Sequence, residues 1–404
     1  MKIVIAPDSF KGSLSAAEVA GAISHAIRSV HPEWETVEVP IADGGEGTVD
    51  AILTAMSGRR VPMTVKSPLL TDVTAEFALI HGGKTAVIEM AQASGLTLVP
   101  EDRRNPLLTT TYGTGQLVRR AIEEGCTRIL IGIGGSATVD GGCGMAAALG
   151  VRLLDAKGED VPLGGGGLRH LRKIDVSDRI ALSGVEITAL ADVTNPLLGE
   201  NGAARVFAPQ KGATAEMVEV LERNLAHFAG VIKAEFGLDV AKIPGAGAAG
   251  GLGAGIVAFL NGDIRSGTAA VIDLVGLREK ARGADLLVTG EGRLDMQSAG
   301  GKAPVGVASV ASELGVPVIA ICGSLGEGSA EAVRDHFLAV ISLAEIAGSP
   351  EEAMRRPVEL LEEAAVRFLE VCPGPWKKVT PPVADLCSRR RERATSRSYF
   401  RRRR

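Results

Sequence analysis

The sequence of 404 residues predicts an α/β protein in which a discontinuous domain is interrupted by a second α/β domain. Segments that fit buried strands alternate with helical segments at the start of the chain and again after residue 284. The intervening residues contain an antiparallel hairpin and several glycine-rich stretches. We therefore expect a discontinuous domain of residues 1–70 and 285–371, an inserted domain of residues 71–284 and a disordered basic tail of residues 372–404.

The first strand–helix unit lies at the beginning of the chain. KIVIA (residues 2–6) fits a short buried strand, and apolar side chains recur at helical spacing over residues 15–30. Ser15 and Glu18 have the spacing of a capping box, which indicates where this helix begins. The loop between strand and helix contains Asp8.

A second unit and a hairpin follow. Apolar residues alternate over residues 37–41, Asp43 lies in the next loop, and a helix then ends at Gly58. The segment FALIHGGKTAVIE (residues 77–89) has two apolar runs around a Gly-Gly pair, which is typical of an antiparallel hairpin. Glycine-rich stretches occur at residues 113–115, 164–167 and 244–255, and we expect them to be loops. All three precede the last strand–helix units of the chain.

The last strand–helix units begin near residue 284. ADLLVTGEGR (residues 284–293) fits a strand and a loop, residues 303–315 fit a helix, and residues 316–323 fit another strand. Residues 372–404 contain prolines and arginine runs without apolar periodicity, as in disordered segments. These patterns place the two ends of the discontinuous domain.

The net charge of −4 conceals an uneven distribution. From Trp376 onward the chain has eleven Lys or Arg against two acidic residues, so the preceding part is strongly acidic. An acidic body with 3% aromatic residues argues against nucleic acid as a partner of the body. The arginine-rich tail could bind nucleic acid or an anionic surface, or it could be a solvated extension without function.

The cysteine pattern and the hydropathy indicate a cytoplasmic protein without a membrane partner. Five cysteines are dispersed along the chain and form no C-x-x-C pair, which argues against a disulfide framework and a zinc site. The apolar run at the N-terminus is too short for the core of a signal peptide, and no apolar stretch approaches the length of a membrane span.

The stretch IGIGGSATVDGGCGM (residues 131–145) first resembles a dinucleotide-binding fingerprint. Gly132, Gly134 and Ala137 match G-x-G-x-x-A after a predicted strand. However, three further glycines follow Val139, and each interior glycine costs a helix about 1 kcal/mol relative to alanine. Only about residues 143–149 remain as a helix, so we reject the NAD interpretation.

The remaining loop suits a phosphate or a carboxylate ligand, because backbone N–H groups before a helix attract anions. Its candidate binding residues are Gly135, Ser136, Thr138 and Asp140. No G-x-x-x-x-G-K-[ST] motif and no G-x-S-x-G motif occur in the chain, so a Walker-type ATPase and a serine hydrolase are unsupported. The histidines are scattered without the spacing of metal ligands.

Other predicted loops contain carboxylates, hydroxyls and cations of the same kind. They contribute Asp8, Ser9, Lys11 and Ser13; Asp43 and Glu46; Asp192 and Asn195; Lys211; Glu291, Arg293 and Asp295; and Lys302. Any one of these residues could be ordinary turn chemistry or a solvated charge. Together, carboxylates for Mg²⁺ and cations for phosphoryl oxygens meet the requirements of phosphoryl transfer.

The motifs as a set resemble the type I glycerate kinases. The resemblance rests on APDSFKGSLSA, PIADGGEGT, YGTGQL, GGSATVDGGCGMAAALG, DVTNPLLGENGAA, PQKGA, PGAGAAGGLGAG and DLLVTGEGRLDMQSAGGK, and extends over roughly residues 1–371. It implies phosphorylation of D-glycerate by ATP with Mg²⁺, with ADP and 2-phosphoglycerate as products. It also implies that the discontinuous domain is flavodoxin-like.

Three positions depart from the pattern that this family leads us to expect. Val139 stands where asparagine is usual, Ala191 where cysteine is frequent and Ala208 where glycine is usual. The first departure puts a polar contact in the 131–145 loop in doubt. The tail after Val371 has no counterpart in the family pattern.

From their chemistry and motif positions, we assign roles to the candidate residues. Asp192 is expected to orient or deprotonate the glycerate hydroxyl, and Lys11 and Arg293 to stabilise the transferred phosphoryl group or to bind the glycerate carboxylate. Ser9, Ser13, Gly135, Ser136, Thr138, Asp140, Asn195, Lys211 and Lys302 are expected to bind substrate or phosphate, and Asp8, Asp43, Glu46, Glu291 and Asp295 to hold Mg²⁺. Another hydroxy acid as substrate, a non-catalytic metabolite sensor and a homodimeric assembly remain open.

Overall fold

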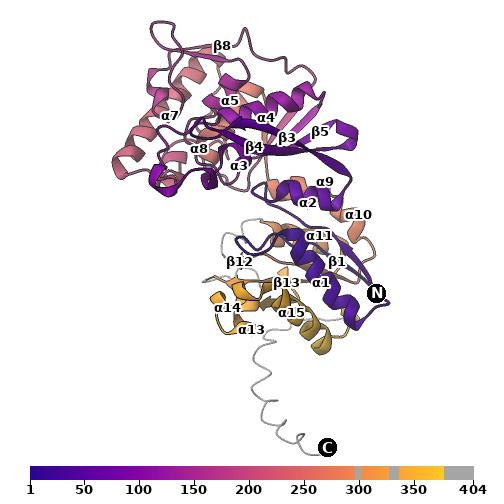
Figure 1. Cartoon of the computed structure of the whole chain (residues 1–404). Helices are drawn as coiled ribbons and strands as arrows, with labels where there is room; N and C mark the ends of the chain where they lie inside the picture. The colour runs from indigo at the N-terminus through magenta and orange to yellow at the C-terminus, as the bar shows by residue number, and fades with distance from the viewer. Residues whose placement is uncertain (296–301, 327–335, 377–404) are drawn as a thin grey trace, which may run out of the picture. The chain divides into compact units, whose positions relative to one another are not determined.

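The computed structural model describes residues 1–295, 302–326 and 336–376, and these residues form two compact units. The first unit comprises residues 1–42, 50–55 and the described residues from 271 onward. The second unit comprises residues 43–49 and 56–270. The helices and strands of both are labelled in Figure 1. The α/β fold class is confirmed, and both units contain parallel strands.

The first unit is built around a five-stranded sheet in which every neighbouring pair is parallel. The strands are β1 (Lys2–Ile5), β2 (Glu35–Glu38), β11 (Leu286–Thr289), β13 (Val318–Cys322) and β15 (Ala339–Ser342). Their spatial order is β2-β1-β11-β13-β15, which is the 2-1-3-4-5 order of flavodoxin-like sheets. The expected strands at both ends of the chain therefore lie in one sheet.

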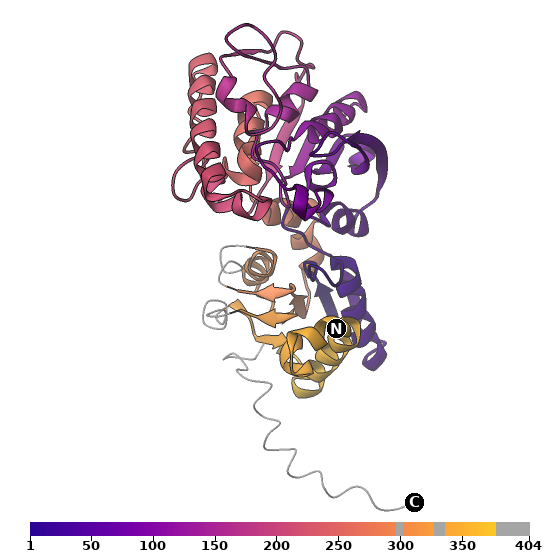
Figure 2. The same ribbon diagram turned by 60° about the vertical axis from the view of Figure 1, so that its left-hand side comes forward.

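Helices cover both faces of this sheet, as Figure 2 shows. The helices with residues in this unit are α1 (Ala16–Val30), α2 (Thr48–Ala55), α9 (Gly267–Leu274), α10 (Leu277–Ala281), α11 (Ala303–Leu314), α13 (Leu343–Ala347), α14 (Pro350–Arg355) and α15 (Pro357–Val371). Helices α1 and α15 pack against each other and share one apolar core with the strands. The predicted capping box is present, because Glu18 N–H donates to Ser15 Oγ and Ser15 N–H donates to Glu18 Oε2.

The expected start of the tail at residue 372 is wrong, because Trp376 is a core residue of the first unit. Its side chain is 1% exposed, stacks on Phe368 and meets Trp34 edge to face. Its indole N–H donates to the Cys372 carbonyl at 2.8 Å. The rest of the predicted tail, residues 377–404, lies outside the described residues.

The second unit contains a mixed six-stranded sheet. Its strands are β3 (Gly58–Lys66), β4 (Asp72–Ile80), β5 (Thr85–Glu89), β6 (Arg128–Gly132), β9 (Glu186–Leu190) and β10 (Asp263–Arg265), in the spatial order β10-β9-β6-β5-β4-β3. The pairs from β10 to β5 are parallel, whereas β5–β4 and β4–β3 are antiparallel. The predicted hairpin over residues 77–89 is thus present.

The bounds of the two units differ from the expected residues 70 and 285. Strand β3 pairs with β4 over its whole length, so residues 58–66 belong to the second unit. Residues 271–284 belong to the first unit, where α10 contacts α11.

Two shorter strand pairs are also present. They are β7 (Arg152–Leu154) with β8 (Lys173–Asp175) and β12 (Arg293–Leu294) with β14 (Ser324–Leu325).

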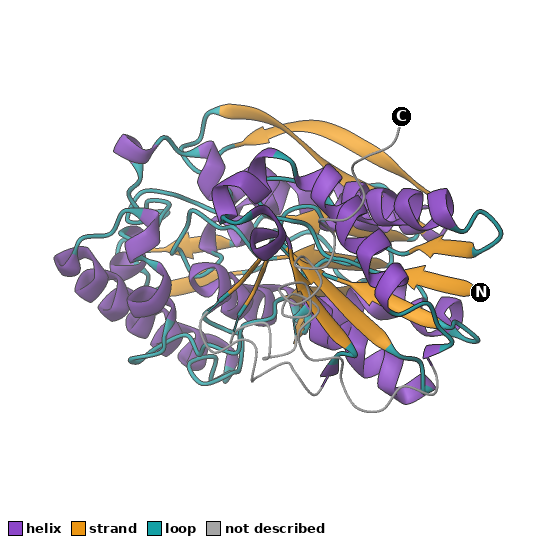
Figure 3. Ribbon diagram, turned by 90° about the horizontal axis from the view of Figure 1, so that it is seen from below, coloured by secondary structure: helices purple, strands orange, loops and turns teal. Residues whose placement is uncertain are grey.

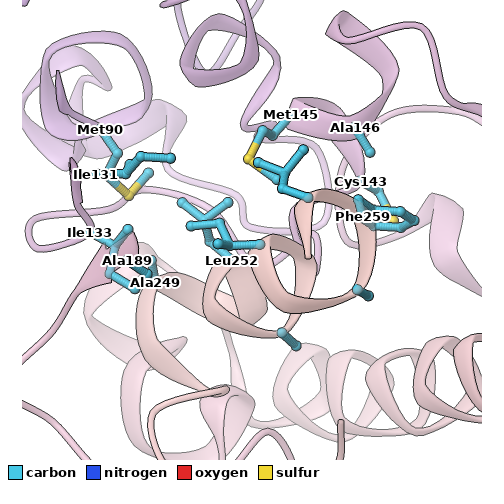
Figure 4. Packing of buried hydrophobic residues seen from close by; sticks show 14 of the residues in the cluster. Met90, Ile131, Ile133, Cys143, Met145, Ala146, Ala189, Ala249, Leu252 and Phe259 are labelled. Carbon is cyan, nitrogen blue, oxygen red and sulfur yellow. The ribbon is translucent and has the colours of Figure 1, made fainter. Parts of the chain in front are cut away.

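Helices of the second unit pack on its sheet, and strands flanked by helices are visible in Figure 3. They are α3 (Ala91–Ser94), α4 (Tyr112–Glu123), α5 (Cys143–Ala148), α6 (Ala203–Phe207), α7 (Ala215–Phe236) and α8 (Ala248–Leu260), with 3-10 turns at His81–Gly83, Leu96–Leu98, Glu101–Arg103, Gly167–His170 and Pro209–Lys211. In Figure 4, Ile131 of β6, Ala189 of β9, Met145 of α5 and Leu252 of α8 lie in one apolar cluster. Within the described residues, no helix combines the length and apolarity that a membrane span requires.

One glycine-rich stretch that we expected to be a loop lies in a helix, and another lies in a helix only in part. Residues 113–115 are in α4, and residues 248–255 are in α8, whose first turn contains left-handed residues at 249–251. A Cβ on Gly113 would lie 1.9 Å from the Lys66 carbonyl oxygen, and one on Gly255 would lie 2.4 Å from the Gly141 carbonyl oxygen. These glycines therefore allow a helix to pack directly against a neighbouring backbone.

Candidate functional site

In the first unit, the predicted polar residues lie at the carboxyl ends of β1 and β11. These two strands are neighbours, and between them the chain order of the sheet reverses, which is where open α/β sheets bind ligands. Asp8 N–H donates to the Gly290 carbonyl at 2.8 Å, and a Cβ on Gly292 would lie 3.2 Å from Lys11 N. The loops that follow β1 and β11 are therefore in contact.

These two loops combine buried carboxylates with exposed cations and hydroxyls. Asp8 and Glu291 are 5% and 7% exposed, and Asp8 Oδ1 accepts a hydrogen bond from Ser9 N–H at 2.6 Å. The remaining predicted residues of this region are Lys11, Ser13 and Arg293, which are exposed, and Asp295 and Lys302, which are half-buried. Lys302 directly precedes the first residue of α11. Such a region can bind a charged ligand that arrives from solvent.

In the second unit, four loops meet at the carboxyl ends of β6, β9 and β10. Three glycines make their close approach possible: a Cβ on Gly44 would lie 2.9 Å from the Leu190 carbonyl oxygen, one on Gly134 would lie 2.8 Å from Gly45 Cα, and one on Gly267 would lie 2.2 Å from the Asp43 carbonyl oxygen. The loop with Asp43 is thus packed against the ends of all three strands.

Asp192 is held in this region by two residues that follow β10. Its Oδ1 accepts from Ser266 Oγ at 2.7 Å, and its Oδ2 accepts from Thr268 Oγ1 at 2.6 Å. The Thr268 N–H also donates to the carboxylate, at 3.2 Å from Oδ2. Burial raises the pKa of Asp192 and the negative charge of Asp43 raises it further, whereas the hydrogen bonds from Thr268 and Ser266 lower it.

The loop with Asp43 is held at its other end by a buried carboxylate. Glu89, which ends β5 and is 4% exposed, accepts from Val49 N–H at 2.6 Å near the start of α2. Within the loop, Asp43 Oδ1 accepts from Gly45 N–H at 2.9 Å. Glu46 is exposed. The position of Asp43 is therefore fixed on both sides.

The 131–145 loop ends in the short helix that we expected, α5, but the Asp140 side chain has no solvent-exposed surface. Its carboxylate accepts from the Thr111, Gly142 and Gly144 N–H groups and from the Thr110 and Thr111 hydroxyls. Burial raises the pKa of Asp140, against the effect of these bonds. Asp140 therefore stabilises the loop from inside, contrary to the binding role that we expected.

Lys211 lies beneath the same loop. Its side chain is 2% exposed, and its Nζ donates to Ser136 Oγ at 2.6 Å and to the Thr138 carbonyl at 2.8 Å. Burial lowers the pKa of Lys211 to about 7, although the charge of Asp140 opposes this shift. Ser136 keeps 8% of its surface exposed and Gly135 is exposed, whereas Thr138 is fully buried.

Two other residues of the prediction have internal roles. The Val139 side chain is fully buried in the apolar cluster of the second unit, so it occupies the core and not a ligand site. Asn195 Nδ2 donates to the Asn201 carbonyl at 2.8 Å, and the Asn195 carbonyl accepts from Gly247 N–H at 3.0 Å. The Asn195 contacts stabilise the loop after β9.

The expected Mg²⁺ ligands are divided between the two units. Asp8, Glu291 and Asp295 belong to the first unit, and Asp43 and Glu46 belong to the second. Over the described ranges, no three His, Cys, Asp or Glu side chains are grouped as a metal site. Mg²⁺ commonly uses only one or two carboxylates together with substrate phosphates and water, so this donor set still fits the ion.

Comparison with known proteins shows the family of this chain. The model of the glycerate kinase family matches residues 3–372. The chain belongs to the glycerate kinase family. It is accordingly a kinase, and Trp376 lies just beyond the part that the family model covers.

Individual members of the glycerate kinase family are similar over almost the whole chain. A glycerate kinase of Halalkalibacterium halodurans is 50% identical over 380 residues, which cover 94% of this chain and 99% of the relative. The glycerate 2-kinase of Escherichia coli K12 is 49% identical, with 88% and 93% coverage. A crystal structure of a protein assigned as glycerate kinase 2 from Salmonella typhimurium LT2 superposes with a TM-score of 0.82 at 45% identity, over 92% of this chain and 98% of that one.

Several residues that support the candidate groups were not predicted from the sequence. Ser266 and Thr268 hold Asp192, Thr111 holds Asp140, and Glu89 holds the start of α2. Ser266 and Thr268 directly follow a strand, so the rule that ligand sites lie at the carboxyl ends of strands could have found them. Nothing in the local sequence marks Thr111 or Glu89 as a partner of its distant neighbour.

Proposed function

We propose that this member of the glycerate kinase family transfers the γ-phosphoryl group of ATP to the 2-hydroxyl of D-glycerate, with release of ADP and 2-phosphoglycerate. The observation that carries the proposal is the oriented, half-buried carboxylate of Asp192 at the carboxyl ends of the strands. The relatives from H. halodurans and E. coli are named as a glycerate kinase and a glycerate 2-kinase, which supports glycerate as the substrate.

Asp192 suits the task of accepting the proton of the attacking hydroxyl. A carboxylate offers about four acceptor positions, and Ser266 Oγ, Thr268 Oγ1 and Thr268 N–H take about three of them. One position is left for the substrate hydroxyl. The raised pKa of Asp192 also lies closer to neutral pH than that of an ordinary aspartate. A general base is most effective when its pKa is near the working pH.

The loops after β1 and β11 in the first unit suit the phosphates of a nucleotide. Lys11 and Arg293 are exposed cations in the same loops as the buried carboxylates of Asp8 and Glu291. Asp8, Glu291 and Asp295, or Asp43 and Glu46 in the second unit, would hold Mg²⁺. The ion neutralises charge on the transferred phosphoryl group. Lys302 would add a further cation to this region.

We also propose that the enzyme works in the cytoplasm. Cys126, Cys143, Cys322 and Cys372 form no disulfide in the part of the chain that the structure describes, and three of them are buried. Reduced, buried thiols are usual in the cytosol.

The decisive experiment supplies the purified chain with ATP, Mg²⁺ and a panel of hydroxy acids, and follows ADP release through a coupled enzyme assay. We expect the highest kcat/KM with D-glycerate. Phosphorus NMR of the product then distinguishes 2-phosphoglycerate from 3-phosphoglycerate. ADP release with another acid only would refute the substrate, and no release with any acid would favour a metabolite sensor.

A further inference from the structure

The contact between Lys211 and Ser136 has a fixed hydrogen-bond direction. An ammonium group has three N–H donors and no acceptor, so in the bond of 2.6 Å Lys211 Nζ donates and Ser136 Oγ accepts. The proton of the Ser136 hydroxyl is therefore directed elsewhere. Among the described residues, the structure shows no other hydrogen bond of this hydroxyl.

Of the two residues that accept hydrogen bonds from this ammonium, Ser136 is the one with solvent-exposed surface. Lys211 is 2% exposed and Thr138 is fully buried, whereas Ser136 keeps 8% of its surface in contact with solvent and follows the exposed Gly135. The second acceptor of the ammonium is the Thr138 carbonyl, in the same loop. Lys211 thus holds the 131–145 loop through two hydrogen bonds, one to the Ser136 hydroxyl and one to the Thr138 carbonyl.

We propose that Lys211 is a positioning residue that turns the Ser136 hydroxyl into an obligate donor for an anionic oxygen of a substrate. This inference rests on the proposed kinase function and goes beyond it by giving the two residues different roles. Ser136 contacts the substrate, whereas Lys211 acts only through Ser136 and the loop. The anionic oxygen belongs either to the carboxylate of the acid or to a phosphate of the nucleotide.

The titration of Lys211 adds a reversible feature to this arrangement. Burial lowers its pKa to about 7, and Asp140 is the charged side chain that acts against this shift. A neutral amine can accept a hydrogen bond, so above this pH the Ser136 hydroxyl can turn toward Nζ and donate to it. The substrate then loses its donor, and the affinity for the anionic oxygen falls as the pH rises.

A double-mutant cycle in which the KM values for D-glycerate and ATP are measured tests the proposal. The variants are Ser136→Ala, Lys211→Met and the double variant, with Lys233→Met, an exposed lysine of α7, as the control for the loss of a lysine. We expect each site variant to raise one KM about 10- to 100-fold, as is usual for a hydrogen bond to a charged group. In the Ser136→Ala background, Lys211→Met should change that KM less than about 3-fold. A rise in the KM for D-glycerate identifies the carboxylate, and a rise in the KM for ATP identifies a phosphate.

A second measurement needs no change at Lys211, and so remains valid if Lys211→Met does not fold. In the wild type, the affected KM should rise by up to about 10-fold per pH unit above pH 7, and this rise should be absent in Ser136→Ala. Multiplicative effects in the cycle, or a pH dependence that persists in Ser136→Ala, would overturn the proposal.

Failure of the proposed function would be recognised separately. If the wild type phosphorylated no hydroxy acid, the same cycle would be measured calorimetrically on the dissociation constant of inorganic phosphate. Non-additive losses of phosphate affinity would then support the role of Lys211 and Ser136, and additive losses would refute it.

Discussion

The strand-end regions of the two units use similar residue types in different environments. In the first unit, Lys11, Ser13 and Arg293 are exposed. In the second unit, Asp192 is half-buried and Lys211 is 2% exposed, and each is oriented by hydrogen bonds within the protein. Exposed charges are screened by water and must be ordered when a ligand arrives, whereas buried and oriented groups act without reorganisation. We therefore expect substitutions of the exposed cations in the first region to cost less than substitutions of Asp192 or Lys211 in the second.

The largest effect is expected for Asp192→Asn. The amide cannot accept a proton from the substrate, so kcat should fall by about 10²- to 10⁴-fold, the usual contribution of a general base. The coupled assay measures the loss, and circular dichroism verifies the fold. Asp263→Asn is the matched control, because Asp263 is an exposed aspartate of β10 that pairs with Arg265. Near wild-type kcat in Asp192→Asn would remove Asp192 from the mechanism.

A second prediction concerns Trp376, an apolar side chain in the core of the first unit that we expect to contribute to stability. Removal of residues 373–404 deletes Trp376 from the core and should lower the free energy of unfolding by about 3–5 kcal/mol. Removal of residues 377–404 retains Trp376 and should leave both stability and kcat unchanged. Urea denaturation of the two truncated proteins measures the difference. Equal stability of the two would show that Trp376 contributes little.

Thr268→Val should have a smaller effect than Asp192→Asn, because it removes a support of the carboxylate and leaves the carboxylate itself. The lost bond from Thr268 Oγ1 is charge-assisted and contributes about 1.5–3 kcal/mol, so we expect kcat/KM for D-glycerate to fall about 10- to 100-fold. Thr268→Ser retains the hydroxyl and should restore most of the activity. If Thr268→Ser were as impaired as Thr268→Val, the hydroxyl would not be the group that matters.

Exposed residues of the first unit provide the direct test of the comparison. Lys11→Met removes a cation that water already screens, so we expect the KM for ATP to rise less than about 10-fold. A loss as large as that of Asp192→Asn would contradict the view that the buried region dominates.

The elements that the sequence predicted correctly are those with a local signal. The capping box of Ser15 and Glu18, the hairpin around Gly82 and the short helix after Gly142 all follow from residues within a few positions of one another. We also expected that loops at the carboxyl ends of neighbouring parallel strands come together. In the structure, the loops after β1 and β11 are in contact. Local patterns were therefore sufficient for the fold class.

The errors arose where distant residues decide the structure. Gly255 lies within helix α8, where the close approach of the Gly141 backbone leaves no room for a side chain. No sequence window around Gly255 reveals this contact. Trp376 follows a proline-rich turn, but Phe368 and Trp34 bury it. Asp140 looked like a ligand-binding carboxylate because its partner Thr111 is 29 positions away in the chain. For glycine and aspartate in these stretches, only the structure distinguishes a role in packing from a role in ligand binding.

The effect expected to be smallest over a single pH unit is a pH-dependent change in stability that distinguishes the buried lysine from an exposed one. The pKa of Lys211 is about 7 in the folded protein and 10.5 in the reference state, so between these values the unfolded chain binds the additional proton. The stability of the wild type should therefore rise relative to Lys211→Met as the pH increases above 7, by at most about 1.4 kcal/mol per pH unit. Urea denaturation of both proteins at pH 6, 7, 8 and 9 measures the difference, and Lys233→Met provides the baseline for the loss of an exposed lysine. The substrate affinity that depends on Ser136 should fall over the same range, so stability and affinity are expected to change in opposite directions. A constant difference in stability from pH 6 to 9 would mean that Lys211 stays charged throughout, and the contrast between the buried and the exposed region would then not extend to titration.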